Sequence, residues 1–217
     1  MTNAITVQSE EYLEAVSRIN DRGQRATTAT LSRELRVAAP SVLGMIRRLK
    51  KHGFIKYSRT TGVTLTASGV TAAGSVRRRH RLAERLLADV LKMPWERVHE
   101  VACRFEHVID EEMEPYLLQA LNHPKTCPHG NPINEEITSS DVRRLTDLKK
   151  NEIGFFRCVY DESNEVLSYL AALRLQPGAK LEVSDIDSLN GSYLVSIEGN
   201  TKIISREVAD QLLLEGR

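Results

Sequence analysis

The chain has 217 residues, 41% hydrophobic and 27% charged, which predicts one or two folded domains and excludes a disordered chain. Its formal net charge of +1 excludes a uniformly basic nucleic-acid coat and a uniformly acidic solvating protein. The charged residues are nevertheless unevenly distributed along the chain. Residues 1–80 contain 14 Lys and Arg against 5 Asp and Glu, whereas residues 81–217 contain 16 against 24. A basic first part and an acidic second part suggest separate functions.

The sequence predicts a cytoplasmic protein. No stretch approaches the roughly 18 apolar residues of a membrane span, and Glu10 and Glu11 occupy a region where a signal peptide is basic and then apolar. The cysteines, Cys103, Cys127 and Cys158, are odd in number and far apart, which fits a reducing compartment better than a disulfide scaffold. A conspicuous cysteine is then a core thiol, a nucleophile or a metal ligand.

The basic part of the chain predicts three helices followed by a hairpin. Apolar residues recur at helical spacing in residues 9–20, 28–35 and 40–52. Pro40 suits the first turn of a helix, where its missing N–H costs nothing. Residues 54–57 and 63–66 predict two short strands with Gly62 at the tip of their turn. This order is typical of a winged helix-turn-helix domain, which we place at residues 1–66.

The third of these helices would be the recognition helix. Small residues at its start would face the bases, and cations along it and on the wing would contact phosphates. The expected DNA-binding residues are Pro40, Ser41, Gly44, Arg47, Arg48, Lys50, Lys51, Lys56 and Arg59. Alternatively, the cations only form the solvated face of a helix, but the hairpin and the net charge of +9 over residues 1–80 favour DNA.

A helical domain with a linker is expected at residues 67–140. Residues 67–91 and 98–121 predict two long helices whose apolar stripes are wider than a lone domain of this size needs. These wide apolar stripes therefore indicate that the helices form a dimer interface. Residues 122–140 contain three prolines and a glycine among polar residues, which predicts a loop and then a linker.

Beyond the linker the hydrophobic period becomes that of strands. Residues 154–160, 180–183, 193–197 and 201–204 predict strands, residues 165–173 predict a helix, and residues 175–178 predict a turn. Several short strands with one helix favour a small barrel at residues 141–217. The expected fold class is therefore mainly α with a small β-domain.

A cluster of ligand-type residues falls in the two long helices. His99, Cys103, Glu106 and His107 stand at i, i+4, i+7 and i+8, so they would share one helix face. On the preceding helix, a second pair stands four residues apart: His80 and Glu84. Imidazole, thiolate and carboxylate from two helices suit iron, zinc or manganese better than calcium.

Each of these residues alone also has an ordinary structural explanation. A single histidine is usually a hydrogen-bonded core or surface residue, and a buried cysteine usually behaves as a small hydrophobe. Glu106 could pair with Arg104 or Arg81. Six ligand-type residues in two helical registers nevertheless favour a metal site. Cys127 and His129 form a weaker second pattern on the loop, because closed structural zinc sites normally have four clear ligands.

Two motifs resemble the metal-ligating helices of the diphtheria toxin repressor (DtxR/MntR) family of metal-dependent repressors. They are RHRLAERLL at residues 79–87 and VHEVACRFEHV at residues 98–108. The resemblance covers essentially the whole chain. It implies a winged-helix domain, a helical dimerisation domain that carries the metals, and a C-terminal SH3-like (FeoA-like) barrel.

The resemblance also implies the metal ligands. It assigns a primary site to Glu11, Cys103, Glu106 and His107, and an ancillary site to His80, Glu84 and His99. In manganese-type members, the position of His80 belongs to the primary site. Cys127 and His129 resemble a loop that completes a second site with Glu84 and an acid from the barrel. The candidate acids are Asp161, Glu162 and Glu165, and the sequence does not choose among them.

Three positions combine the patterns of the family's two types or depart from them. Glu11 stands where iron-type members have methionine and manganese-type members a carboxylate, whereas Cys103 follows the iron type. The carboxylate favours Mn²⁺ and the thiolate favours Fe²⁺, so either metal is a candidate. Gly44 stands where iron-type members carry glutamine, which predicts fewer base contacts and more readout of DNA shape.

The sequence therefore predicts a dimeric repressor, activated by Mn²⁺ or Fe²⁺ at two sites per subunit, that binds a palindromic DNA operator and controls metal-homeostasis genes. No membrane and no small-molecule substrate is expected. One alternative is a metalloenzyme with Glu106 as general base, but no motif such as His-Glu-x-x-His supports it. Another is a DNA-binding protein with purely structural zinc, which would unfold when its metal is removed.

Overall fold

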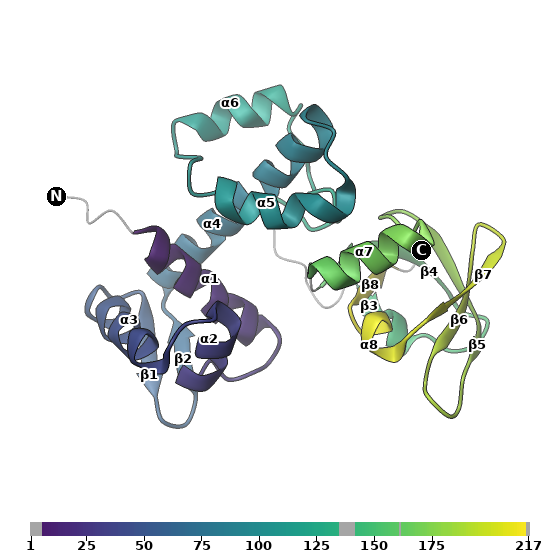
Figure 1. Ribbon diagram of the computed structural model, residues 1–217, viewed down its shortest axis with the longest axis horizontal. Coiled ribbons are helices and arrows are strands. Elements are labelled where there is room, and N and C mark those ends of the chain that lie inside the picture. Colours follow the sequence, from purple (N-terminus) through teal and green to yellow (C-terminus); the bar gives the residue numbers. More distant parts are fainter. Residues whose placement is uncertain (1–5, 135–141, 161, 216–217) are drawn as a thin grey trace. The chain divides into compact units, whose positions relative to one another are not determined.

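The computed structural model describes residues 6–134, 142–160 and 162–215. The chain divides into two compact units, Met1–Arg79 and His80–Arg217, and each is described by itself. Helix α4 (Ala67–Arg85) contributes residues to both (Figure 1). None of the described helices combines the length and apolar character that a membrane crossing requires.

The first unit has the winged helix-turn-helix order that the sequence predicts. Helices α1 (Val7–Asp21), α2 (Thr28–Leu35) and α3 (Ala39–Lys51) precede the hairpin of β1 (Ile55–Ser58) and β2 (Gly62–Leu65), as Figure 1 shows. Thr27 and Thr30 form a capping box at the start of α2. Gly62 has a φ of +77°, and an added Cβ would lie 2.6 Å from the Ala26 carbonyl oxygen. The wing can therefore approach the chain before α2 only with glycine at this turn.

The apolar faces of these elements form one core. Tyr12, Leu13, Val16 and Ile19 of α1 are buried in it. From the other elements it receives Leu31, Val42, Met45, Ile46, Leu49, Ile55 and Val63. This burial leaves the opposite face of α3 exposed, which is the face that carries its cations.

The helical part of the second unit differs from the expectation in one respect. The expected single helix over residues 98–121 is wrong. The chain forms α5 (Val98–Phe105) and α6 (Met113–Ala120), with turns between them. Asp110 causes the restart, because its carboxylate accepts hydrogen bonds from the backbone N–H groups of Glu112 (3.0 Å) and Met113 (2.8 Å). A π-helical turn (Leu86–Val90) continues α4, and a 3₁₀ turn (Trp95–Arg97) precedes α5.

The β-domain is a six-stranded antiparallel sheet with strand order β3-β8-β4-β5-β6-β7. The strands are β3 (Arg143–Arg144), β4 (Ile153–Val159), β5 (Lys180–Ile186), β6 (Tyr193–Ile197), β7 (Asn200–Ile204) and β8 (Leu212–Glu215). Helices α7 (Asn164–Leu173) and α8 (Arg206–Ala209) and a 3₁₀ turn (Leu145–Asp147) complete it. The expected SH3-like domain is confirmed, although β3, β8 and α8 were not anticipated.

Candidate metal centre

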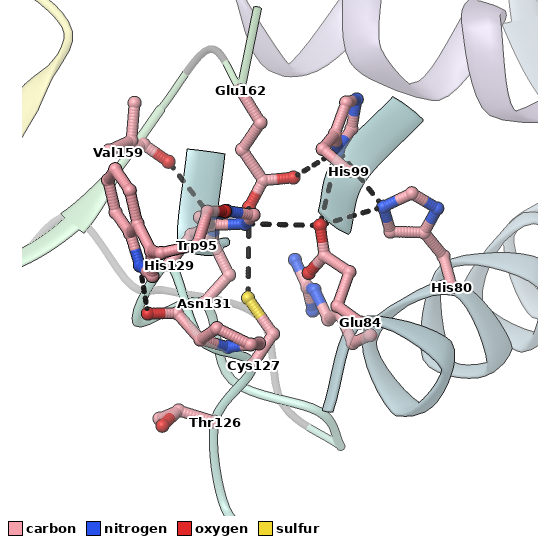
Figure 2. A network of polar contacts seen from close by, with 12 residues as sticks. His80, Glu84, Trp95, His99, Thr126, Cys127, His129, Asn131, Val159 and Glu162 are labelled. Carbon is pink, nitrogen blue, oxygen red and sulfur yellow. Dashed lines mark hydrogen bonds and ion pairs between the residues drawn. The ribbon is translucent and has the colours of Figure 1, made fainter. Parts of the chain in front are cut away.

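Three overlapping groups of side chains in the second unit bring ligand atoms within 4.8 Å of one another, counting only described residues. We call them the helix group (His80, His99 and Cys103), the bridging group (His80, Glu84, His99 and Glu162) and the loop group (Glu84, Cys127, His129 and Glu162). They combine side chains of α4, α5, the loop after α6 and the segment before α7 (Figure 2).

His80 is the centre of the helix group. It is buried, and its Nδ1 lies 2.6 Å from Glu106 Oε2. On the other side of the ring, Nε2 lies 3.1 Å from both Glu84 Oε1 and His99 Nδ1. Cys103 Sγ lies 3.8 Å from His99 Nε2, one turn along α5. The spacing of four residues on each helix thus brings imidazole, carboxylate and thiolate groups together as expected.

The loop group adds side chains that are distant in sequence. His129 Nδ1 lies 3.1 Å from Glu84 Oε1 and 3.4 Å from Glu162 Oε1. Cys127 Sγ lies 3.7 Å from Glu162 Oε1. The second oxygen of Glu162 lies 3.1 Å from His99 Nδ1, so this carboxylate joins the loop to α5 (Figure 2).

Backbone contacts hold this loop in place. Arg85 donates from Nε to the Thr126 carbonyl (2.6 Å), and Arg81 donates to the Pro132 carbonyl. Asn131 donates to the Val159 carbonyl (3.1 Å) and to Glu162 Oε1 (2.6 Å). The loop is therefore fixed both to α4 and to the end of β4.

Gly130 allows the loop to approach β4. Its φ is +90°, and a Cβ there would lie 1.8 Å from the Arg157 carbonyl oxygen. Any other residue would have to move the loop away from β4. The position of the loop that carries Cys127 and His129 thus depends on a glycine at residue 130.

Charge and burial shift the titration of these groups. Burial lowers the pKa of His99, but hydrogen bonds to Cys103, Glu162 and Glu84 outweigh it and raise the pKa to about 11. Burial also lowers the pKa of His80 and His129, but the Glu84 charge and hydrogen bonds outweigh it and leave both pKa values well above the ordinary value. Burial raises the pKa of Cys103, yet the neighbouring histidines lower it to about 7. Imidazolium, carboxylate and thiolate groups thus neutralise one another in the metal-free protein.

The donor set fits a divalent transition metal. Glu84 is fully buried, and its Oε2 has no hydrogen-bond partner among the described residues. A buried carboxylate oxygen without a donor is costly unless a cation is bound there. Nitrogen, sulfur and carboxylate donors together suit manganese, iron or zinc.

The remaining expected ligands lie in different settings. Glu106 is buried against His80, and His107 Nε2 lies 3.4 Å from Glu106 Oε1, just beyond the end of α5. Neither belongs to the three groups. Glu11 is exposed on α1 of the first unit.

Of the three candidate acids, Glu162 lies in two of the groups, the bridging group and the loop group. Glu165 is exposed in the first turn of α7 and belongs to none of the three. Asp161 lies outside the described residues.

The expected DNA-binding residues are exposed on α3 and the wing. They are Pro40, Ser41, Gly44, Arg47, Arg48, Lys50, Lys51, Lys56 and Arg59. Leu43 and Tyr57, which sequence reasoning did not select, are exposed on the same elements. Arg25 donates to the Arg59 carbonyl (2.8 Å) and so supports the wing.

Sequence reasoning also missed the residues that hold this loop. Arg85 and Trp95 donate to its backbone, and Asn131, within the loop, donates to the Val159 carbonyl at the end of β4. None of the three is a typical metal ligand. The only signal was that Arg85 and Asn131 lie close in sequence to ligand-type residues.

Comparison with known proteins supports this arrangement over nearly the whole chain. Residues 4–63 match the N-terminal DNA-binding domain of the iron-dependent repressors. Residues 66–135 match the metal-binding and dimerisation domain of the same repressors. Residues 143–216 match the FeoA domain.

Individual relatives and a solved structure agree with these matches. The iron-dependent repressor IdeR of Mycobacterium leprae is 38% identical over 131 residues, which cover 60% of this chain and only 57% of that relative's length. The diphtheria toxin repressor of Corynebacterium glutamicum is 34% identical over 220 residues, covering 95% of both chains. A manganese-dependent transcriptional repressor in complex with manganese has a TM-score of 0.87 at 26% identity, covering 96% of this chain and all of its own.

Proposed function

This chain belongs to the diphtheria toxin repressor family of iron-dependent repressors, and from that premise we propose that it is a transcriptional regulator whose DNA binding is activated by Mn²⁺ or Fe²⁺. The family consists of DNA-binding repressors and not of enzymes. The observation that carries the proposal is the buried Glu84 carboxylate. Its Oε2 has no hydrogen-bond partner among the described residues, and imidazole and thiolate groups surround the carboxylate. We assign the protein to the cytoplasm, where its DNA lies.

Two metal sites per subunit are part of the proposal. The loop group, with His80 and His99 beside it, supplies one donor set. The other is the primary site of Glu11, Cys103, Glu106 and His107. Its support is the family resemblance, together with the position of Cys103 in the helix group and the contact between Glu106 and His107.

The chain's own residues determine what such a site does. Carboxylates and a thiolate held close together repel one another unless protons or cations neutralise them. In the metal-free protein, protonated His80, His99 and His129 perform that role. The carboxylate, thiolate and imidazole donors of these groups would hold a divalent cation, which would supply the positive charge in place of the protons.

DNA recognition is assigned to α3 and the wing. Cations along α3 and on β1 would contact phosphates, and the small residues Pro40, Ser41 and Gly44 leave the start of α3 free to approach the bases. Two copies of this domain would bind the half-sites of a palindrome.

We assign dimerisation to exposed apolar residues of the helical domain. Val90, Leu91, Met113 and Tyr116 are 54%, 61%, 39% and 71% exposed, although they lie in a domain of the dimerising type. Exposed apolar residues in such numbers are typical of a protein interface. The proposed partner is a second copy of this chain.

Metal can activate DNA binding only to the extent that it binds the DNA-competent state of the protein more tightly than the other states. The experiment compares metal-free and Mn²⁺-loaded protein for binding to labelled DNA at fixed ionic strength, while far-UV circular dichroism follows the fold. A folded metal-free protein with weak DNA binding that tightens with Mn²⁺ supports the proposal. Unfolding on metal removal would support structural zinc instead.

A further inference from the structure

We infer that Trp95, which lies just before α5, is a positioning residue for the loop group and sets its metal affinity without touching the metal. This inference rests on the proposed function, because it concerns one of its two metal sites. Trp95 is the single tryptophan of the chain, and it lies beside His129 (Figure 2).

Trp95 contacts the loop in three ways. Its indole Nε1 donates to the Pro128 carbonyl oxygen at 2.8 Å. Its ring meets the His129 imidazole edge to face, with centroids 4.9 Å apart and planes at 71°. Its backbone carbonyl lies 3.0 Å from His129 Nε2. Trp95 therefore contacts the Pro128 carbonyl, the His129 ring and His129 Nε2.

The last contact decides which nitrogen can bind a metal. A carbonyl oxygen only accepts, so His129 Nε2 carries the proton and donates it to Trp95. In neutral His129 the lone pair is then on Nδ1, the atom that lies 3.1 Å from Glu84 Oε1. Metal-ligating histidines commonly donate their other N–H to a carbonyl or carboxylate in this way, and such partners affect metal affinity by roughly 10- to 100-fold.

The side chain of Trp95 is needed because the loop has little regular structure. Cys127, Pro128 and His129 belong to no helix or strand, so their positions depend on such contacts. Trp95 also packs, partly buried, against the core of the SH3-like domain. The indole is thus held on one side by that core and on the other contacts the loop, which makes it a rigid support for His129.

The experiment measures Mn²⁺ binding by the electron paramagnetic resonance of free Mn²⁺ in four full-length proteins. They are wild type, His129→Ala, Trp95→Phe and Trp95→Ala. His129→Ala identifies the loop-group class of sites, since that class should disappear. If His129→Ala removes no class, the assignment of the loop group as a metal site is wrong, and the test distinguishes that failure from failure of the inference.

We expect Trp95→Phe to weaken the loop-group class by about 10-fold, because it keeps an aromatic ring but loses the N–H donor. Trp95→Ala should weaken it further, and the other class should keep its affinity in both variants. Tyr193→Phe is the matched control, since it also removes one hydrogen bond to a carbonyl, that of Thr146 (3.1 Å), inside the SH3-like domain. Tyr193→Phe should leave the Mn²⁺ affinity of both classes of sites unchanged.

A merely structural role of Trp95 would lower the unfolding temperature of the metal-free protein and weaken both classes alike. In the wild-type protein, Trp95 fluorescence should change as Mn²⁺ is added, with the same midpoint as Mn²⁺ binding to the loop-group class of sites. The inference is overturned if Trp95→Phe and Trp95→Ala both keep loop-group affinity within about twofold of wild type. It is also overturned if filling that class leaves the fluorescence unchanged.

Discussion

Glu162 Oε2, just before α7 in the SH3-like domain, lies 3.1 Å from Nδ1 of His99 in α5 of the helical domain. The same carboxylate contacts His129 through its other oxygen. Burial and the nearby Glu84 charge oppose ionisation of Glu162, yet the hydrogen bonds from His129 and His99 hold its pKa well below the usual range. The SH3-like domain therefore supplies a charged carboxylate to the bridging group and the loop group.

Glu162→Gln should weaken metal binding at the loop group by more than about 10-fold, because it replaces a charged donor by a neutral amide. Calorimetric titration with Mn²⁺ measures the effect. Glu165→Gln is the matched control, since Glu165 is exposed three residues further along and lies in none of the ligand groups. Equal losses in the two variants would mean that net charge, and not the position of Glu162, controls affinity.

Metal binding should release protons. His99 has a pKa of about 11 and is therefore charged near neutral pH, whereas a metal ligand must be neutral imidazole. Cys103, with a pKa of about 7, must also bind as thiolate. Affinity for Mn²⁺ should therefore rise with pH between about pH 6 and 8. Titration calorimetry in two buffers of different ionisation enthalpy measures the released protons, and identical heats in both would contradict this prediction.

Two glycines in the first unit should respond oppositely to alanine. At Gly44 in α3 an added Cβ meets nothing within 4 Å, so Gly44→Ala should raise the free energy of unfolding by about 1 kcal/mol. At Gly69 in α4 a Cβ would lie 2.0 Å from the Phe54 carbonyl, so Gly69→Ala should lower it. Urea unfolding followed by circular dichroism compares the variants. A stabilised Gly69→Ala would show that the wing and α4 are not packed as described.

Arg47 should contribute to DNA affinity through charge. Arg47→Ala should weaken DNA binding. It should also reduce the slope of log affinity against log salt concentration by about 1, the contribution of one phosphate contact. Lys180→Ala removes the same charge from an exposed position on β5 and should change neither quantity. Fluorescence anisotropy over a series of salt concentrations provides the measurement. An unchanged salt dependence for Arg47→Ala would indicate that this face of α3 does not meet DNA.

Local patterns in the sequence predicted most of the elements. The range of α2 was predicted to the residue, because Thr27 and the apolar spacing define it. The long helix expected over residues 98–121 was wrong, because a single capping residue, Asp110, interrupts a pattern that is otherwise helical. Strand β8 was missed because a short apolar run does not reveal its position between β3 and β4 in the sheet.

The site was predictable only where its residues share a helix. The spacing of four residues in His80 and Glu84, and in His99 and Cys103, is visible in the sequence and brings these groups together. The selection of Glu162 depends on tertiary contacts through Asn131 and Gly130, which no local pattern encodes. For the same reason, the contact between Trp95 and the loop was not predictable from the sequence.

If metal activates DNA binding, metal and DNA must each tighten the other's binding, and a thermodynamic cycle measures this coupling. A palindromic duplex is first selected from a random pool by Mn²⁺-loaded protein. DNA affinity is then measured with and without Mn²⁺, and Mn²⁺ affinity with and without the duplex, at one ionic strength. Both affinities should rise by the same factor, between about 5- and 150-fold per coupled site. Equal DNA affinity with and without Mn²⁺ would contradict it.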